Sequence, residues 1–584
     1  MNDMREKAAE PIHGQMTYDE SVAWLTAPGA DWELVTETVR GVEYQVFKNL
    51  PATLRDVYQQ ACQDHGDKDF LVFQDTRLTY AETYERVAAL THQLIHRYGV
   101  KKGDRVAIGM RNYPEWVIAF MAITSSGAIS VSLNGWWSGE ELEYGFKDSG
   151  ARLAIFDQQR YERVASKLPA LGVKSIGVRW EDELPEGVDD FDDVWREVAG
   201  QPMPDVDLGP HDDVTILFTS GTTGFPKGAV STHRGVLSGI GSWGFYGAQR
   251  IAMGLLEEPE ENPEFQPSIL MPLPLFHVSG SHAGLLASFG VGRKIVMMYK
   301  WNPELGLELI ERERVTSFNG VPTMTWEMLQ SPSLNERDLR SLIAVSGGGA
   351  PIPGGMVDRL QALMPDKHWS FGWGMTETNA GGAGNTDEGL VEKPDSCGKP
   401  CPIVELKIID DDGNELPTGE QGELIMKSSM NIRGYWNRPE ATAETIQDGW
   451  LRTGDIAEID EDGFLYIRDR KKDMVLRGGE NIYCAEIERV VYQHPAVYEA
   501  AAFGVPDDRL GEELAVVVVP KDGADLDAAE VRTHVGEHLA RFKVPRYVWL
   551  QDEQLPRGAT EKIHKRTLRD QILREAPEFH QCAR

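Results

Sequence analysis

The densest group of residues that could bind an anion follows a short apolar run, Val214–Phe218. It reads Thr219-Ser220-Gly221-Thr222-Thr223-Gly224-Phe225-Pro226-Lys227-Gly228. The hydroxyl groups and the lysine can surround a phosphate, and the glycines let backbone N–H groups approach it. A Walker loop needs Gly-Lys-Ser/Thr, whereas Gly follows the lysine here. We therefore predict a phosphate-binding loop of another type, placed at the end of a buried strand.

Three further segments could bind other parts of a nucleotide. In Gly372–Glu377, an aromatic ring could stack on a base, a threonine hydroxyl could bind a phosphate and a carboxylate could hold Mg²⁺. The glycine-rich turn Ser346–Pro351 would let a flat base lie against the backbone, although triple glycine also occurs in linkers. Asp455, in Arg452–Asp455, could accept both hydroxyls of a ribose, although a lone Thr-Gly-Asp is often only a turn.

Together these segments resemble, in order, the motifs of the adenylate-forming superfamily. This superfamily contains acyl-CoA synthetases, peptide-synthetase adenylation domains and beetle luciferases. The similarity extends over about residues 50–570, and its overall texture is closest to fatty acyl-CoA synthetases. The resemblance implies an N-terminal domain, residues 1–471, that binds ATP and an acid, and a mobile C-terminal domain, residues 472–584, that carries the catalytic lysine.

The resemblance also assigns roles to individual residues. It implies that Lys562, His277, Glu377 and Thr376 are catalytic, that Glu377 holds Mg²⁺, and that Lys472 is the hinge of the C-terminal domain. It implies a channel for the CoA thiol arm lined by Gly478 and Gly479. The implied ATP-binding residues are Thr219, Ser220, Gly221, Thr222, Thr223, Gly224, Lys227, Gly348, Gly349, Ala350, Pro351, Gly372, Trp373, Gly374, Met375, Asp455 and Arg470.

Two positions depart from the family pattern. Trp373 stands where the family usually has tyrosine, so a larger ring could alter the acyl pocket beside the adenine. Glu561 stands where glycine usually precedes the catalytic lysine. It raises two questions: whether the loop keeps its freedom, and whether Glu561 pairs with Lys562 and weakens its charge.

The elements that must position these residues alternate along the chain. Thr79–Glu82 is a capping-box pattern ahead of an amphipathic helix. We expect strands over 106–110, 129–133 and 152–156 and helices over 114–123 and 138–149. Residues 397–469 have the short strands and turns of a small antiparallel barrel or sheet, and the last 110 or so mix both element types. We predict an α/β fold in which a large N-terminal domain, built from two α/β subdomains and a small β-barrel, is hinged to a small α+β C-terminal domain.

Composition limits the classes of partner. The 584 residues have 59 Lys and Arg against 92 Asp and Glu, a formal charge of −33, which argues against a nucleic-acid binder. Residues 116–139 are uncharged and long enough to span a bilayer, but their polar residues and glycines favour a buried helix followed by a strand, so we expect no integral membrane segment. The five cysteines are scattered, and the first residues contain no apolar run, so we expect no signal peptide. We expect a cytoplasmic protein, and the sequence leaves open whether it forms a homodimer.

The leading hypothesis is an acid–CoA ligase that uses ATP, Mg²⁺ and CoA and activates a small-molecule carboxylic acid, with a medium- or long-chain fatty acid favoured and aryl acids open. A second hypothesis is a stand-alone adenylation enzyme that transfers an acyl or aryl group to a carrier protein or an amine. A third is a non-catalytic nucleotide sensor.

His534–His538 fits H-x-x-E-H, but a zinc site needs a third ligand and a water, so we disfavour zinc catalysis. The expected acid-pocket walls are Trp243, Phe245, Tyr246, His277, Ser279, Asn319, Gly320, Val321, Gly347, Trp373 and Gly374.

Overall fold

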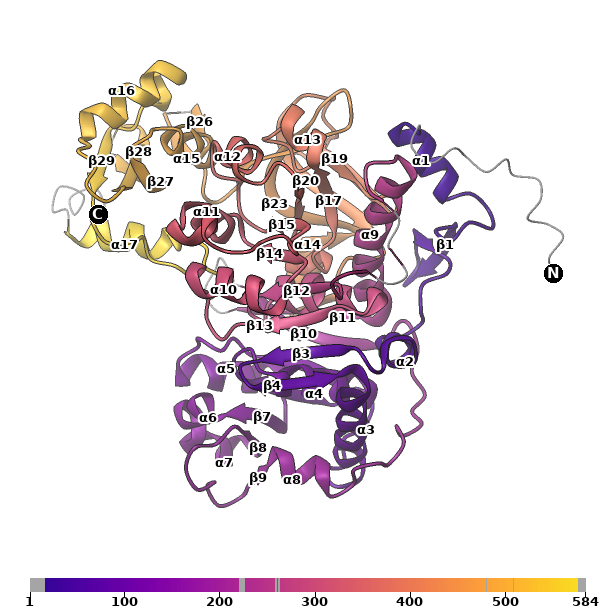
Figure 1. The fold of residues 1–584 in the computed structure, drawn as a ribbon. Helices are drawn as coiled ribbons and strands as arrows, with labels where there is room; N and C mark the ends of the chain where they lie inside the picture. Colours follow the sequence, from indigo (N-terminus) through magenta and orange to yellow (C-terminus); the bar gives the residue numbers. More distant parts are fainter. Residues whose placement is uncertain are drawn as a thin grey trace.

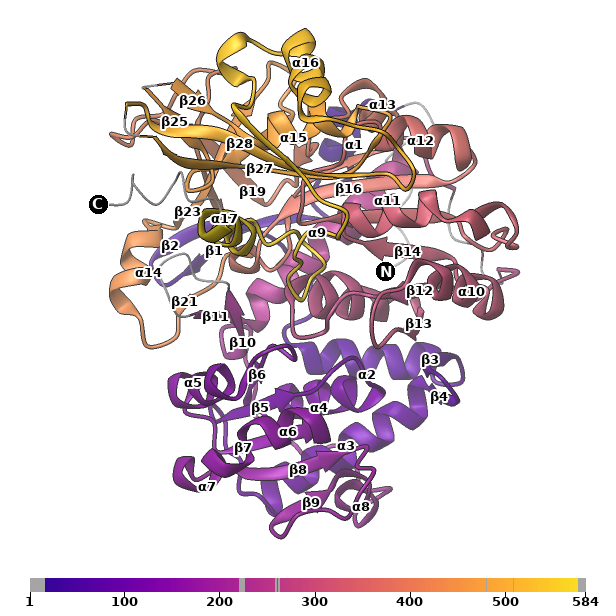
Figure 2. The same cartoon turned by 90° about the vertical axis from the view of Figure 1, so that its left-hand side faces the viewer.

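The computed structural model describes residues 16–219, 226–257, 260, 263–478, 480–507 and 509–575. Two large mixed sheets are followed by a five-stranded antiparallel sheet and then by the five-stranded sheet of the C-terminal part. In Figures 1 and 2 the yellow C-terminal part lies at the end of the molecule opposite the purple strands β7–β9. The predicted α/β class, with a large N-terminal domain and a small C-terminal one, is confirmed.

The first large sheet has the strand order β21-β11-β10-β6-β5-β7-β8-β9. Its strands from β10 to β9 are parallel, and β11 and β21 are antiparallel additions at one edge. Its strands are β5 (Arg105–Gly109), β6 (Ile129–Ser132), β7 (Leu153–Asp157), β8 (Lys174–Val178), β9 (Val188–Asp190), β10 (Asp213–Thr219), β11 (Lys227–Thr232) and β21 (Gly434–Tyr435). Helix α3 (Tyr80–His96) precedes β5, and the helices between the strands are α4 (Pro114–Ser125), α5 (Gly139–Ser149), α6 (Gln158–Val164), α7 (Leu168–Leu171) and α8 (Phe191–Arg196).

The second large sheet has the order β18-β17-β16-β15-β14-β12-β13-β3-β4 and is parallel from β16 to β3. Its strands are β3 (Asp69–Phe73), β4 (Thr76–Thr79), β12 (Ser268–Met271), β13 (Lys294–Met297), β14 (Ser317–Gly320), β15 (Ala344–Gly348), β16 (His368–Gly374), β17 (Gly382–Thr386) and β18 (Lys399–Pro400). Its helices are α2 (Leu54–His65), α9 (His233–Ala252), α10 (Pro303–Glu313), α11 (Pro322–Gln330), α12 (Met356–Leu363) and α13 (Asp387–Glu392). A π-helix, η2 (Ser279–Leu285), runs into a 3₁₀ helix, η3 (Leu286–Val291).

The third sheet, β19-β20-β23-β22 with β24 paired to β23, is antiparallel, as predicted for residues 397–469. Its elements are β19 (Val404–Ile409), β20 (Gly422–Ser428), α14 (Pro439–Thr445), β22 (Ile446–Gln447), β23 (Trp450–Ile459) and β24 (Leu465–Arg470). The C-terminal part has β25 (Val475–Arg477), β26 (Glu480–Ile482), α15 (Cys484–Tyr492), β27 (Val497–Asp507), β28 (Gly511–Pro520), α16 (Ala528–His538), β29 (Tyr547–Leu550) and α17 (Lys565–Glu575). The chain changes sheets between β24 and β25.

Local sequence signals account for several of these elements. Thr79 caps α3 in a capping box with Glu82, as predicted. The uncharged stretch 116–139 forms the buried helix α4 and the buried strand β6. None of the described helices has the length and hydropathy that a membrane span needs. One apolar core runs through both large sheets, which fixes their relative position and so the cleft between them.

The segment ahead of the two large sheets packs against α9. It forms α1 (Tyr18–Leu25), β1 (Leu34–Val39) and β2 (Val42–Phe47). Trp32 packs edge-on against Phe47 and Phe245, whereas Trp24 is 41% exposed. This segment therefore extends the outer side of α9, with Trp32 packed and Trp24 at the surface.

Candidate active site

Most of the predicted site residues line one cavity of about 2440 Å³ between the large sheets, the third sheet and the C-terminal part. The predicted residues in its wall are Thr219, Lys227, His277, Gly348, Gly349, Ala350, Pro351, Gly372, Trp373, Gly374, Met375, Thr376, Glu377, Asp455, Arg470, Lys472 and Lys562. Ser220, Gly221, Thr222, Thr223, Gly224 and Gly479 lie outside the described residues. Gly478 is described but does not line the cavity.

The flanks of the predicted phosphate loop are cross-strand partners. Thr219 ends β10 and Lys227 begins β11, and the two residues are paired in the antiparallel register. The six residues Ser220–Phe225 between them lie outside the described chain. A hairpin therefore holds Lys227 at the cavity wall, opposite the hydroxyl-bearing end of β10.

Asp455 and Arg470 are brought together by strand pairing. They are partners in the register of β23 and β24, and Arg470 Nε lies 2.6 Å from Asp455 Oδ1. The Trp373 indole N–H donates to Asp455 Oδ2 at 2.9 Å. Burial raises the pKa of Asp455, and the Arg470 guanidinium and the indole N–H oppose that rise. The tryptophan that departs from the family pattern thus orients the carboxylate expected at the ribose.

Glu377 is buried beside a tyrosine that the sequence analysis missed. The Tyr435 hydroxyl donates to Glu377 Oε1 at 2.8 Å, and Lys227 Nζ lies 4.1 Å from the centre of the Tyr435 ring. Tyr435 reaches this position because β21 pairs with β11. The only local signal was an aromatic residue after Gly434, which is too common to single out. Tyr435 links the predicted metal ligand to the predicted phosphate-binding lysine.

His277 follows β12 and is held in a neutral form. The Ser279 N–H donates to His277 Nδ1 at 3.3 Å, so the neutral ring carries its proton on Nε2. Burial, with the Lys562 and His282 charges, lowers the pKa of His277 to about 3. The ring can therefore donate a hydrogen bond into the cavity, but it carries no positive charge near neutral pH.

Lys562 enters the cavity from the loop that precedes α17. A Cβ atom added to Gly349 would lie 3.2 Å from Lys562 Nζ, so the ammonium group rests against the turn after β15. Burial lowers the pKa of Lys562 to about 8, the Arg470 charge adds to this effect, and Asp455 opposes it. The loop is closed by a hydrogen bond of 2.8 Å from the Gly558 N–H to the Lys562 carbonyl.

Glu561 has a φ of 58°, in the left-handed region that favours glycine. This geometry explains why glycine suits this position in the family whose motifs the chain resembles. The Glu561 side chain lies in a small pocket with Arg111, Tyr299 and Lys300 of the large domain. Among the ion pairs of the described residues, none joins Glu561 to Lys562, so the pairing that we considered is not present in this domain arrangement.

The expected acid-pocket walls line the cavity with one exception. Trp243, Tyr246, Ser279, Asn319, Gly320, Val321 and Gly347 are in its wall, with the residues named above. Phe245 is not, because it is fully buried on the other side of α9 and stacks on Phe47. Residues 243 and 246 face the cavity and 245 faces away, as the helical period requires.

Two family models match the chain: the AMP-binding enzyme model over residues 58–436 and the AMP-binding enzyme C-terminal domain model over residues 486–562. The chain is 35% identical to a feruloyl-CoA synthase from Amycolatopsis sp. over 496 residues, 85% of this chain and 94% of that protein. It is 34% identical to the long-chain-fatty-acid–CoA ligase FadD13 of Mycobacterium tuberculosis over 508 residues, 86% and 95% of the two chains. A solved Mycobacterium tuberculosis fatty acyl CoA synthetase aligns with a TM-score of 0.68 at 30% identity, over 90% of this chain and 99% of that chain.

The chain belongs to the AMP-binding enzyme family. The predicted superfamily and enzyme class, an AMP-forming acyl-CoA synthetase, are confirmed by these matches. Members of the AMP-binding family use ATP and CoA, as expected from the motifs.

The donors around Glu377 fit a magnesium ion. Tyr435 uses one carboxylate oxygen, so Oε2 remains as a hard oxygen ligand beside Thr376. Hard oxygen donors are what Mg²⁺ prefers, and the cavity offers phosphates the remaining positions. Glu377 therefore suits the metal role that the AMP-binding resemblance implies.

The small domain of this AMP-binding enzyme contacts the large one through a buried ion pair. Arg557 Nη2 lies 2.9 Å from Glu327 Oε1 on α11, and each side chain is 12% exposed. Trp301 Nε1 donates to the other oxygen, Oε2, at 2.7 Å, and Arg557 also contacts Glu499 of β27. These contacts hold the loop of Lys562 against the large domain.

Gly478 lies in the β25–β26 turn, where its N–H donates to the Leu510 carbonyl at 2.8 Å. It is outside the cavity wall in this arrangement of the two domains. A glycine that lines a thiol channel would have to reach the cavity after the small domain has turned, so its role is not represented in the present arrangement.

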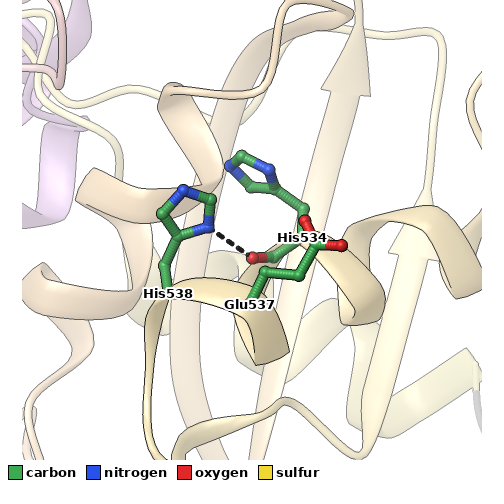
Figure 3. A group of neighbouring side chains, drawn as sticks. All are labelled: His534, Glu537 and His538. Atoms are coloured by element: carbon green, nitrogen blue, oxygen red, sulfur yellow. Dashed lines mark hydrogen bonds between the residues drawn. The ribbon is translucent and has the colours of Figure 1, made fainter.

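His534, Glu537 and His538 lie together on α16, and one potential ligand atom from each falls within 4.8 Å of the others (Figure 3). The His538 Nδ1 atom bonds to the His534 carbonyl at 2.8 Å. None of the three lines the cavity that contains Lys562. Zinc assistance to chemistry at the predicted site therefore has no geometric support.

Proposed function

We propose that this chain is an ATP-dependent acid–CoA ligase that activates a medium- or long-chain fatty acid. The observation that carries the proposal is the position of Lys562: its ammonium group lies in the cavity against Gly349, within electrostatic reach of Asp455 and Arg470. A lysine at the meeting point of three predicted nucleotide motifs is suited to stabilise negative charge at an α-phosphate. The names of the relatives, a long-chain-fatty-acid–CoA ligase and a feruloyl-CoA synthase, support acid activation of this kind.

The first step forms an acyl-adenylate. A carboxylate oxygen of the acid attacks the α-phosphorus of ATP, and the bond to pyrophosphate breaks. Lys562 neutralises charge on the reacting oxygens, and neutral His277 donates a hydrogen bond to the carboxylate. Asp455 and Arg470 bind the ribose, the backbone at Gly348–Pro351 and the Trp373 ring border the adenine, and Lys227 binds the outer phosphates.

Mg²⁺, when bound, neutralises phosphate charge, and Glu377 is the residue that would hold it, with Thr376 beside it. Tyr435 orients the Glu377 carboxylate through the hydrogen bond of 2.8 Å. We include Tyr435 in the proposed site for this reason.

The second step transfers the acyl group to CoA. The thiolate attacks the acyl carbon, and AMP leaves with the electron pair of the broken C–O bond. We propose that residues 472–584 turn about Lys472 between the steps, which withdraws Lys562 and brings Gly478 and Gly479 to the thiol path. The change of sheet between β24 and β25, on either side of Lys472, supports this hinge.

A panel of acids tests the proposal. Purified enzyme is given ATP, Mg²⁺ and each acid, and pyrophosphate release is measured with and without CoA. We expect release that depends on a medium- or long-chain acid, together with an acyl-CoA product identified by mass spectrometry. Acid-dependent release without any thioester would instead favour a carrier protein or an amine as acceptor, and no release with any acid would support a sensor.

A further inference from the structure

Arg293 is a cation of the cavity wall for which the described residues provide no counter-ion. Its backbone is fixed, since its N–H donates to the Ser288 carbonyl at 3.1 Å and its carbonyl accepts the Tyr80 hydroxyl at 2.8 Å. Its guanidinium takes part in none of the side-chain hydrogen bonds or ion pairs found among the described residues. Enclosure lowers the pKa of Arg293, and the Tyr80 hydroxyl is the one group found to oppose this.

Arg293 lies at the end of the cavity remote from Lys562. Two walls lead there: η2 and η3 continue from His277 through Ala283 and Ala287 to Arg293, and α9 runs beside them from Trp243 onward. The floor is the face of the second large sheet, from Gly347 back to Ile343 at the start of β15. We call the part lined by Arg250, Leu256, Arg293, Ile343 and His368 the distal end.

The strand register gives the length of this channel. Ala344 of β15 is level with Ile295 of β13 through β14 and β12. Gly347 lies three residues beyond Ala344, and Arg293 lies two residues before Ile295. Five strand residues at about 3.3 Å each separate the two levels by roughly 17 Å. An extended acyl chain whose carboxylate reacts beside His277 can therefore reach the level of Arg293.

The two arginines of the distal end differ in charge balance. Arg250 contacts Asp387 and also lies 3.1 Å from His368 Nδ1, so its charge is neutralised within the protein. Arg293 has no such partner among the described residues. Between the distal end and His277, the wall formed by η2 and η3 is apolar, with Ala283 and Ala287, whereas the sheet floor carries Ile269 and the small hydroxyl residues Ser317, Ser346 and Ser370. A half-enclosed cation without a counter-ion is costly, and a carboxylate can bind a guanidinium through two parallel hydrogen bonds.

We propose that Arg293 binds a second carboxylate at the far end of the substrate, so that the preferred acids are straight-chain α,ω-dicarboxylic acids. The first carboxylate reacts at Lys562, the methylene chain crosses the apolar wall, and the distal carboxylate pairs with the guanidinium in a bidentate manner. This inference rests on the proposed acid–CoA ligase function and narrows its substrate class. Arg293 acts as a specificity residue that touches the substrate but not the reacting atoms.

The test compares acids of equal length that end in a carboxylate or in a methyl group, over about eight to sixteen carbons, a range that brackets the channel length. Acid-dependent pyrophosphate release gives kcat/KM for each acid with the wild type, Arg293→Met and Arg293→Lys. We expect the wild type to prefer the dicarboxylic acid, and Arg293→Met to lower kcat/KM for that acid by about 10–100-fold, the usual effect of losing a charge-assisted hydrogen bond. The methyl-ended acid should react as in the wild type or faster, which also shows that the variant is folded. Arg293→Lys should retain part of the preference.

Equal losses for both acids, or a wild type that prefers the methyl-ended acid, would overturn the inference and leave the ligase proposal intact. If Arg293→Met has lost its fold, Arg293→Gln, which keeps a polar side chain, replaces it in the same comparison. No pyrophosphate release with either acid in the wild type would instead contradict the proposed function on which the inference rests.

Discussion

At the residue scale, the charge of Lys562 is the quantity on which the proposed first step depends. Burial lowers its pKa to about 8, so the side chain is a cation below that pH and loses its proton above it. We predict that kcat/KM for acid-dependent pyrophosphate release falls as the pH rises through about 8. The pH profile of this rate, which reports the free enzyme, measures it.

Lys562→Arg is the matched control for this prediction, because a guanidinium keeps its charge throughout this range. The variant will be slower, since its geometry differs, but its alkaline fall should move to higher pH. An alkaline fall at the same pH in both proteins would assign the titration to another group.

Glu561→Gly tests the strain of the loop that carries Lys562. At a φ of 58°, a non-glycine residue destabilises the folded protein by about 1–2 kcal/mol, and glycine avoids this penalty. Glu561→Gln removes the charge but keeps the strain. We predict that Glu561→Gly has a higher melting temperature than Glu561→Gln, with adenylation unchanged or modestly faster and thioesterification unchanged. Equal melting temperatures would show that the loop stores no strain, and a large loss of adenylation would show that Glu561 orients Lys562.

The residues of the site differ in how far they could be predicted. Lys562, Asp455 and Glu377 lie in contiguous motifs that resemble those of the family, so their presence in one site could be predicted from the sequence. Tyr435 and Arg293 could not, because they reach the cavity through pairing or packing of segments that are distant in sequence. The Trp373 contact with Asp455 is of the same kind, since 82 residues separate the two.

At the element scale, the contact of α11 with the Lys562 loop determines which domain arrangement is stable. Glu327 is bound on one side by Trp301 and on the other by Arg557, and both charged side chains are largely buried. We predict that Glu327→Gln slows adenylation by about 10-fold, the effect of losing one charge-assisted hydrogen bond, because the loop docks less firmly. Thioesterification of a supplied acyl-adenylate should be unchanged or faster.

Glu311→Gln is the matched control for this variant. Glu311 pairs with Arg337 at 3.0 Å within the large domain, and both side chains are 33% exposed, so its loss should change neither half-reaction. If Glu327→Gln slowed both half-reactions equally, the pair would serve folding rather than domain position.

Most elements followed from local patterns, and their arrangement did not. The helices α4 and α5 and the strands β5, β6 and β7 begin and end within a few residues of expectation, and α3 begins where its capping box predicts, because capping boxes and apolar periods are local signals. The order of the nine strands in the second sheet, in which β3 pairs with the much later strand β13, depends on long-range packing that no local pattern contains.

At the scale of the whole molecule, the proposed two-step reaction requires two arrangements of the domains. The present one places Lys562 in the cavity and leaves Gly478 outside it. Lys472, in the turn between β24 and β25, lines the cavity, and its N–H donates none of the hydrogen bonds found among the described residues. A change of φ and ψ at Lys472 would therefore break no hydrogen bond of its own N–H, and the contacts of Arg557 with Glu327 would have to separate.

Lys472→Pro should therefore keep the first step and lose the second. Proline fixes φ and so opposes the rotation, while no hydrogen bond of the present arrangement is broken. We expect adenylate formation near the wild-type rate and strongly reduced thioester formation, measured separately by pyrophosphate release and by acyl-CoA yield. Lys472→Ala, which allows the rotation, is the control. Normal acyl-CoA turnover in the proline variant would place the hinge elsewhere.

The most direct test of the account separates the two half-reactions in Lys562→Ala. In one arm, the variant receives ATP and the acid; in the other, it receives CoA and a supplied acyl-adenylate. Because the lysine acts only while the α-phosphate is attacked, we predict a loss of about 10²–10³-fold in the first arm. Thioester formation in the second arm should remain near the wild-type rate. Equal losses in both arms, or an unaffected first arm, would contradict the role of Lys562 and with it the proposed two-step mechanism.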